Sequence, residues 1–330
     1  MQGTRRRLGC ALIVGLVAAL GATPAAARPA SPPLTEPPRK LADALECSAG
    51  LASANERPVL LVHGTGSNRD ENWSWGYRTV LPARGIPTCT VELPDRAWVD
   101  IQRSVEYVIY AVRRMFRRSD RQVSVVGHSQ GGIHPVWALR FFPDVRPLIE
   151  DVIAMGTPYQ GTEGGELLEC ASTGCPPSVW QQTTGSNLVA ALNRKPPPAA
   201  PDYTSIATKF DQVSYPQPEA SRLTGAREIL IQDICPTRPT DHFFLAADAV
   251  AFAIVIDALE HLGPADPARV PAAVCDQVTF PGVDTVKFAQ VLVTAFTLPA
   301  VTGVAYDKQV KSEPPLRCYA RPACVRRRRR

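Results

Sequence analysis

The sequence lacks the cysteine and histidine spacings that hold metal ions. It has no C-x-x-C pair and no paired Cys/His spacing, which argues against a metal cluster. It has no internal repeat, and its longest apolar run is shorter than the roughly 20 residues that span a bilayer. We therefore predict a chain without a metal or other cofactor and without a membrane anchor.

The net charge of the chain is small once its two terminal segments are set aside. The formal net charge is +5, but removing three N-terminal arginines leaves +2, and removing Arg326 to Arg330 as well leaves −3. This excludes a basic groove for nucleic acid. We expect residues 326–330 to be a solvated, disordered tail. The alternative is weak docking of this tail to an anionic surface.

The N-terminus has the pattern of a secretory signal peptide. Arg5 to Arg7 precede an apolar run from Leu8 to Leu20, and Ala25 to Ala27 offer a cleavage site. We predict that residues 1–27 are removed and that the protein is secreted and extracellular. Residues 28–46 are predicted to be a flexible, proline-rich lead-in to a domain at 47–325.

Eight cysteines remain once the signal peptide is set aside, and an even number in an exported chain predicts disulfides. They are Cys47, Cys89, Cys170, Cys175, Cys235, Cys275, Cys318 and Cys324. The residues alone leave the pairing open.

Short apolar runs alternate with amphipathic segments along the domain. We predict strands at 58–62, 88–93, 122–126, 151–155, 203–208 and 229–234, and helices at 99–118, 132–142, 243–262 and 284–298. This alternation predicts an α/β fold with a mainly parallel sheet covered by helices on both faces. Residues 159–202, broken by glycine and proline, are predicted to be a small insertion over the site.

The stretch Gly127-His128-Ser129-Gln130-Gly131 lies between a predicted strand and a predicted helix. In that context G-x-S-x-G is typical of a nucleophile elbow, in which the serine occupies a strained turn. The helix N-terminus then directs positive partial charge at the serine, where an oxyanion would form. A glycine-rich turn with an incidental serine is the alternative.

A serine hydroxyl needs a base, and five histidines are available. His63 and His128 lie in loops that build the site floor, His134 lies in the elbow helix, and His261 ends a helix. This leaves His242, which follows the last predicted core strand.

The base needs a carboxylate from a loop between the serine and the histidine. Asp211 follows a strand at the correct edge, whereas Asp202 precedes that strand and is the second choice. Asp233 falls inside a predicted strand, and Asp241 points away from its neighbour His242.

Donors for the oxyanion come from two places. The backbone N–H of Gln130 is one, and Thr65 in the loop after the first core strand is the other. We also take His63, Thr157 and Trp180 as candidate substrate contacts.

The chain resembles the Candida antarctica lipase B family within the α/β-hydrolases. The resemblance runs, with gaps, from about residue 47 to 322. It is strongest in Ser178-Val179-Trp180-Gln181-Gln182-Thr183-Thr184-Gly185-Ser186, and it is also present at 58–66, 137–143 and 319–322. It implies Ser129 as nucleophile, Asp211 as acid, His242 as base, and Thr65 with Gln130 as oxyanion hole.

The resemblance also implies two disulfides, Cys47–Cys89 and Cys235–Cys275. By elimination we add the local pairs Cys170–Cys175 and Cys318–Cys324. The chain departs from the family in the acid loop, which carries two extra residues before Asp211.

The resemblance and the triad pattern together predict a secreted serine ester hydrolase, a triacylglycerol lipase, which acts on lipid or other esters as a monomer in contact with a lipid interface. The first alternative is a carboxylesterase of short-chain or polymeric esters. The second is a catalytically idle protein that binds surfaces through its basic tail.

Overall fold

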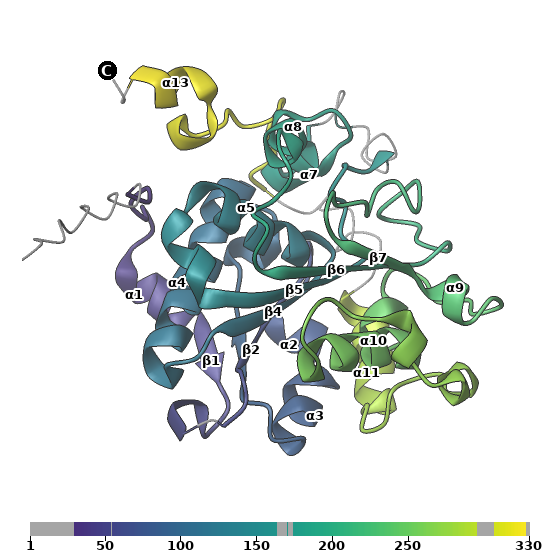
Figure 1. The fold of residues 1–330 in the computed structure, drawn as a ribbon. Helices are drawn as coiled ribbons and strands as arrows, with labels where there is room; N and C mark the ends of the chain where they lie inside the picture. Colours follow the sequence, from purple (N-terminus) through teal and green to yellow (C-terminus); the bar gives the residue numbers. More distant parts are fainter. Residues whose placement is uncertain (1–29, 54, 164–169, 171–173, 296–306, 328–330) are drawn as a thin grey trace, which may run out of the picture.

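Seven strands form one sheet in the order β1-β3-β2-β4-β5-β6-β7 (Figure 1). This is a computed structural model, and it describes residues 30–53, 55–163, 170, 174–295 and 307–327. The strands are β1 (Leu45–Cys47), β2 (Val59–Val62), β3 (Thr88–Val91), β4 (Val123–His128), β5 (Ile149–Met155), β6 (Asp202–Ala207) and β7 (Arg227–Leu230). Every neighbouring pair is parallel except β1 with β3. The loops after the parallel strands therefore meet at one edge, where sites form in such sheets.

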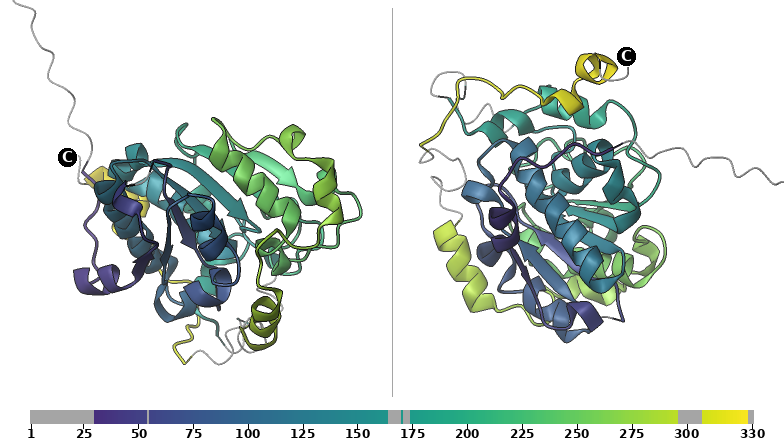
Figure 2. Two further views of the ribbon diagram at one scale, coloured as in Figure 1. Left: turned by 90° about the horizontal axis from the view of Figure 1, so that it is seen from below. Right: turned by 90° about the vertical axis from the view of Figure 1, so that its left-hand side faces the viewer.

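Helices cover both faces of this sheet, as the alternating pattern predicts (Figure 2). They are α1 (Pro38–Asp43), α2 (Arg69–Trp73), α3 (Tyr77–Ala83), α4 (Ile101–Ser119), α5 (Ile133–Phe141), α7 (Pro177–Gln182), α8 (Asn187–Asn193), α9 (Ile231–Ile234), α10 (Ala249–Glu260), α11 (Thr285–Ala295) and α13 (Pro322–Arg327). The strand β2 shows how the two cores are divided. Leu60 and Val62 pack with α4 and α5, whereas Val59 and Leu61 pack with α3 and α10. Each such fully buried side chain contributes roughly 1.5–3 kcal/mol.

The long helix α4 carries clear signals at both ends. The Asp100 side chain accepts a hydrogen bond from Gln102 N and so caps the N-terminus. Asp120 ends the helix in a left-handed conformation, with φ of 53°. Arg117 and Arg118 lie in the last turn, where cations stabilise the helix dipole.

Three predictions about secondary structure need correction. The predicted strand at 229–234 ends at Leu230, and residues 231–234 form α9. The predicted helix at 243–262 begins at Ala249, because the Asp248 side chain accepts hydrogen bonds from the N–H groups of Val250 and Ala251. The short edge strand β1 has no counterpart in the prediction, since three residues give no periodic signal.

The described part of the lead-in is docked on α4 rather than loose. Thr35 N and Glu36 N both donate to the buried Glu106 carboxylate, at 2.5 and 2.8 Å. The guanidinium of Arg317, near the C-terminus, reaches the same carboxylate. One buried acid therefore fastens residues 35 and 36 and Arg317 to α4. The predicted signal peptide at 1–27 lies outside the described residues.

Three of the four predicted cysteine pairs are bonded, namely Cys47–Cys89, Cys170–Cys175 and Cys235–Cys275. The prediction of a Cys318–Cys324 bond is wrong, since the described structure leaves Cys324 without a disulfide. Helical turns at 318–320 and 322–327 separate the two residues.

The C-terminal tail and the insertion are partly helical. Residues 326 and 327 of the predicted tail belong to α13, and residues 328–330 lie outside the described part. The described part of the insertion contains α7 and α8 and contributes no strand to the sheet.

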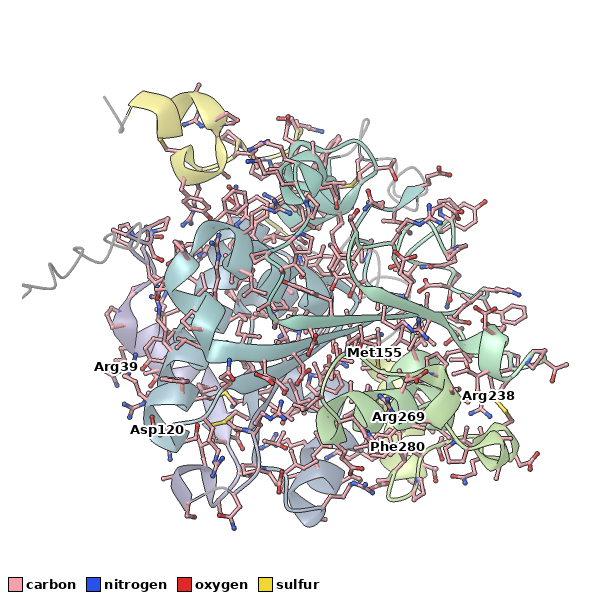
Figure 3. All side chains as sticks on the ribbon, in the orientation of Figure 1. Arg39, Asp120, Met155, Arg238, Arg269 and Phe280 are labelled. Carbon is pink, nitrogen blue, oxygen red and sulfur yellow. A yellow bond between two sulfur atoms is a disulfide. The ribbon has the colours of Figure 1, made fainter. Side chains whose placement is uncertain are left out.

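The buried ion pair Arg238–Asp248, at 2.7 Å, fixes the turn before α10 (Figure 3). None of the helices in the described ranges has both the length and the apolar character needed to cross a bilayer.

Candidate active site

Ser129 lies directly after β4, in the turn that leads into α5, with φ of +54°. Left-handed backbone is unfavourable for a residue with a side chain, and it turns the serine out of the strand. The flanking residues Gly127 and Gly131 must be glycine because neighbouring backbone leaves no room for a side chain. A Cβ at Gly131 would stand 2.2 Å from Val62 O, and one at Gly127 would stand 2.5 Å from the backbone of Gly131. The motif therefore has the tight strand-to-helix crossing that its sequence predicts.

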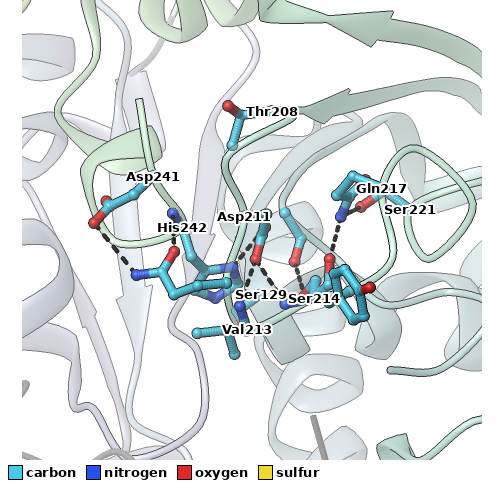
Figure 4. Close-up of polar contacts among 12 residues, drawn as sticks. Ser129, Thr208, Asp211, Val213, Ser214, Gln217, Ser221, Asp241 and His242 are labelled. Atoms are coloured by element: carbon cyan, nitrogen blue, oxygen red, sulfur yellow. Dashed lines mark hydrogen bonds and ion pairs between the residues drawn. The ribbon is translucent and has the colours of Figure 1, made fainter. Parts of the chain in front are cut away.

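His242 and Asp211 meet beside this turn (Figure 4). His242 Nδ1 lies 2.8 Å from Asp211 Oδ2, and both side chains are buried. The other carboxylate oxygen accepts hydrogen bonds from Val213 N and Ser214 N, at 2.9 and 2.6 Å. Because Asp211 accepts a hydrogen bond from the Nδ1–H group, His242 keeps its lone pair on Nε2, as a general base requires.

Gly156 and Thr157, which follow β5, connect the serine to this pair. Thr157 Oγ1 donates to the carbonyl of Ser129 at 2.7 Å. The backbone of Gly156 lies so close to the pair that a Cβ there would stand 3.0 Å from both His242 Nδ1 and Asp211 Oδ2. The structure thus brings Ser129, Asp211 and His242 to the same edge of the sheet.

The two predicted oxyanion donors belong to segments that lie against the serine. Gly64, next to Thr65, is packed against Ser129 so closely that a Cβ on it would stand 2.9 Å from the serine Cβ. Gln182 Nε2 donates to Thr65 Oγ1 at 3.1 Å, which leaves the hydroxyl proton of Thr65 free to point elsewhere. Gln130 follows Ser129 and is fully buried, so its N–H is fixed at the start of the helical turn.

The three predicted substrate contacts have other partners in the structure. His63 is fully buried, accepts a hydrogen bond from Leu93 N on Nε2 and contacts Gly64 O through Nδ1, both at 2.9 Å. Thr157 is fully buried against the serine carbonyl. Trp180 donates its indole N–H to Val310 O at 2.9 Å. Their contacts support the loops around the site, and the sequence could not separate this role from substrate binding.

The histidines around His242 stay neutral. Burial lowers the pKa of His63 to about 3, of His128 to about 3 and of His134 to about 4. His128 Nε2 lies 3.0 Å from the carbonyl of His242, and the two rings are 5.1 Å apart. His128 therefore helps to hold the backbone of His242 without adding a charge next to it.

Sequence reasoning missed three residues that shape the site. Asn72 is buried, and its Oδ1 accepts from Gly64 N at 3.1 Å and lies 3.3 Å from His128 Nδ1. Gln182 holds the hydroxyl of Thr65, and Gly156 lies against the His–Asp pair. Gln182 belongs to the family-specific run, which could have indicated it. Asn72 and Gly156 give no local signal, since their roles depend on distant partners.

The described side chains around the site do not form a set of metal ligands. Among the described residues, no three His, Cys, Asp or Glu side chains gather as metal ligands do. The site contains a serine hydroxyl, an imidazole with an oriented lone pair, and backbone N–H donors. Acyl transfer requires these groups.

The chain is similar to known lipases over most of its length. It is 28% identical to lipase B of Pseudozyma antarctica over 325 residues, which cover 95% of this chain and 94% of that protein. No protein-family model matches the sequence.

Solved structures agree with this comparison. The structure superposes on lipase B of Aspergillus fumigatus with a TM-score of 0.80 and 26% identity, covering 89% of this chain and 74% of that one. A Bacillus licheniformis lipase in its propeptide form gives a TM-score of 0.50 at 16% identity, covering 67% of this chain and 54% of that one, and so supports the fold alone. The chain therefore has the α/β-hydrolase fold, is similar to lipase B proteins over most of its length, and is a carboxylic ester hydrolase.

Proposed function

We propose that the chain is a secreted triacylglycerol lipase that works through an acyl-enzyme on Ser129, with His242 as general base and Asp211 as the carboxylate that orients it. The observation that carries this proposal is the 2.8 Å contact between His242 Nδ1 and Asp211 Oδ2, next to a serine in a left-handed turn. The three residues come from loops after β4, β6 and β7, in the chain order expected for this fold.

Acylation begins when Ser129 Oγ attacks the ester carbonyl. His242 Nε2 accepts the hydroxyl proton, and the resulting imidazolium is stabilised by Asp211. The tetrahedral intermediate then collapses, the ester C–O bond breaks, and His242 returns the proton to the departing alcohol. A water molecule, activated by the same imidazole, releases the carboxylic acid and regenerates the serine.

The negative charge of the intermediate falls on the former carbonyl oxygen. The N–H groups of Gln130 and Thr65 and the hydroxyl of Thr65 are the proposed donors to it. Because Thr65 Oγ1 already accepts from Gln182, its own proton is free to be donated. Donors fixed before the reaction stabilise the developing charge without rearrangement, and each is worth roughly 2.7–4 kcal/mol.

The direct test replaces the nucleophile and the base. Ser129→Ala and His242→Ala should lose turnover of p-nitrophenyl esters, and Ser129→Ala should not react with an active-serine fluorophosphonate probe. His261→Ala is the matched control, because His261 lies at the end of α10 and bonds the Asp257 carbonyl. Retained turnover in Ser129→Ala contradicts the proposal, and an inert wild type would favour the idle surface-binding alternative.

The outer face of α11 supports a lipid substrate over a short soluble ester. Val286 and Val293 are 68% and 73% exposed there and lie about two helical turns apart, while Phe288 of the same helix is buried in the core. An exposed apolar helix face suits contact with a lipid surface. A lipase should gain activity on emulsified long-chain esters, whereas a carboxylesterase should prefer short-chain soluble or polymeric ones. Rates across acyl chain lengths, with and without an emulsion, separate the two.

Export and the monomeric state belong to the same proposal. Three disulfides suit an oxidising compartment. The mature protein in the culture medium should begin close to residue 28 and elute as a monomer. N-terminal sequencing and light scattering check both points, and an intact Met1 on the exported protein would contradict cleavage.

A further inference from the structure

Three successive residues between β3 and α4 adopt the left-handed conformation, and none is glycine. The φ angles of Asp95, Arg96 and Ala97 are 49°, 54° and 61°. Such backbone is disfavoured for residues with a Cβ and persists only where surrounding contacts hold it. Contacts of this segment with its neighbours must therefore compensate for the strained backbone.

Arg96 makes these contacts, with Glu71 and Gly66. Its guanidinium bonds both oxygens of Glu71, with Nη1 at 2.9 Å from Oε1 and Nη2 at 2.7 Å from Oε2. The same guanidinium donates to Gly66 O, while Gly66 N donates to Arg96 O at 2.8 Å. Arg96 and Gly66 therefore exchange two hydrogen bonds, and Gly66 is the residue next to the proposed oxyanion donor Thr65.

Glu71 belongs to α2, and α2 holds the other end of the same loop. Glu71 N is bonded to Asn68 Oδ1 at 2.9 Å, which fixes the first turn of the helix. One residue on, Asn72 Oδ1 accepts from Gly64 N at 3.1 Å. The loop at 64–66 is thus fastened to α2 directly at Gly64 and through Arg96 at Gly66, with Thr65 between the two attachments.

We propose that Arg96 is a positioning residue that holds Thr65 in place to receive the oxyanion. This inference rests on the proposed function, since it assumes that Thr65 is an oxyanion donor. A donor must be fixed before charge develops, because a donor that reorients during the reaction loses most of its effect. Loss of the guanidinium should therefore slow the chemical step and leave ground-state substrate binding nearly unchanged.

Arg96→Gly is the sharpest variant. Glycine adopts the left-handed conformation without steric cost, so the change removes the Arg96 side chain and its hydrogen bonds without adding backbone strain. We expect kcat on a p-nitrophenyl ester to fall about tenfold or more, with KM within about twofold of the wild type. Rates are normalised to active sites titrated with a fluorophosphonate, so that a smaller folded fraction does not count as lower kcat.

Two further variants separate positioning from general stabilisation. Arg96→Lys keeps the positive charge but loses the planar fork, and should show most of the same fall in kcat. Arg269→Ala removes another two-point arginine–carboxylate pair, with Asp257 at 2.6 and 2.7 Å, beside α10 (Figure 3). The Arg269 side chain is 36% exposed, as that of Arg96 is. Arg269→Ala should retain the wild-type kcat.

The outcomes distinguish the two proposals. A wild-type kcat in Arg96→Gly, with Ser129→Ala inactive, overturns the positioning role and leaves the proposed function standing. An equal loss in Arg96→Gly and Arg269→Ala also overturns it, because any surface ion pair would then have the same effect. Activity in Ser129→Ala overturns both proposals together.

Discussion

His242 Nδ1 and Asp211 Oδ2 are 2.8 Å apart, and the bare backbone of Gly156 lies against both atoms. A methyl group at that position would need room that the two side chains occupy. Gly156→Ala should therefore push the imidazole and the carboxylate apart and lower kcat by about 10- to 100-fold, with a small change in KM. Steady-state kinetics on a soluble p-nitrophenyl ester measure both constants.

The control for Gly156→Ala must reproduce its backbone strain without its contacts. Gly156 has φ of +58°, and Gly263 has φ of +87° with no atom within 4 Å of a Cβ placed there. Gly263→Ala should lower stability modestly and keep the wild-type kcat. If Gly156→Ala is as active as Gly263→Ala per titrated site, the close packing does not govern the His–Asp geometry.

The choice of Asp211 over Asp241 gives a second prediction. In Asp211→Asn, a neutral amide replaces the carboxylate that accepts a hydrogen bond from Nδ1–H, so the imidazole loses its orientation and the imidazolium loses its stabilising charge. We expect kcat to fall by about 10³- to 10⁴-fold. Asp241→Asn should stay active, because the Asp241 side chain accepts hydrogen bonds from Phe244 N and Gln212 Nε2, away from the imidazole, and an amide oxygen can accept one of them. The reverse result would move the acid to Asp241.

The fold and the chemistry of the site could be predicted because their signals are local. The elbow at 127–131 combines its motif with a buried strand and a helix, and the order of the strands fixes which loops follow Ser129. Asp211 could be preferred to Asp202 because Asp202 begins β6 while Asp211 follows it. These inferences needed only periodicity and the rule that sites form at the carboxyl ends of parallel strands.

The supports of the site could not be predicted, because they depend on contacts between distant segments. Nothing near Arg96 in sequence indicates three left-handed residues, a conformation that costs roughly 1–2 kcal/mol per residue. The sequence predicts a strand across α9 because Ile229 to Ile231 form an unbroken apolar run, and short apolar runs do not distinguish strand from helix. The pairing of Cys318 with Cys324 failed because elimination ignores backbone geometry.

Asp151 predicts a dependence of stability on pH. It lies near the start of β5, with its carboxylate 2.6 Å from Ser124 Oγ, and burial raises its pKa to about 7. The unfolded carboxyl titrates near 4, so between about pH 4 and 7 the folded state holds more protons. The contribution of this group to stability is therefore full below pH 4 and is lost as the pH rises through 7.

Asp151→Asn removes that titration while keeping the size of the side chain. The variant should melt at a higher temperature than the wild type at pH 8, by a few degrees, and the gap should shrink toward pH 5. The buried histidines act in the opposite direction but are present in both proteins, so they cancel in the difference. Asp43→Asn, at a side chain 72% exposed, is the control and should show no such trend. A constant gap at pH 5 and 8, measured by calorimetry, would contradict the assignment to Asp151.

The disulfides give a final prediction, which concerns loop length. Cys47–Cys89 joins β1 to β3 across 42 residues, whereas Cys170–Cys175 spans five. A cross-link restricts the unfolded chain more when its loop is longer, which gives about 4 kcal/mol for the first bond and about 2 kcal/mol for the second. Replacing both cysteines of each pair with alanine should therefore lower the free energy of unfolding about twice as much for Cys47–Cys89. The pair Cys235–Cys275, separated by 40 residues, should match the larger value.

Urea titrations of the three double variants, followed by tryptophan fluorescence, measure these differences. Cys324→Ser provides the control for loss of sulfur without loss of a bond, and should leave the unfolding midpoint unchanged. If the short Cys170–Cys175 bond proves as costly to remove as the two long ones, local packing around Trp98 and Val179 governs its contribution instead of chain entropy. The order of the three midpoints decides between these causes, because packing predicts no relation to loop length.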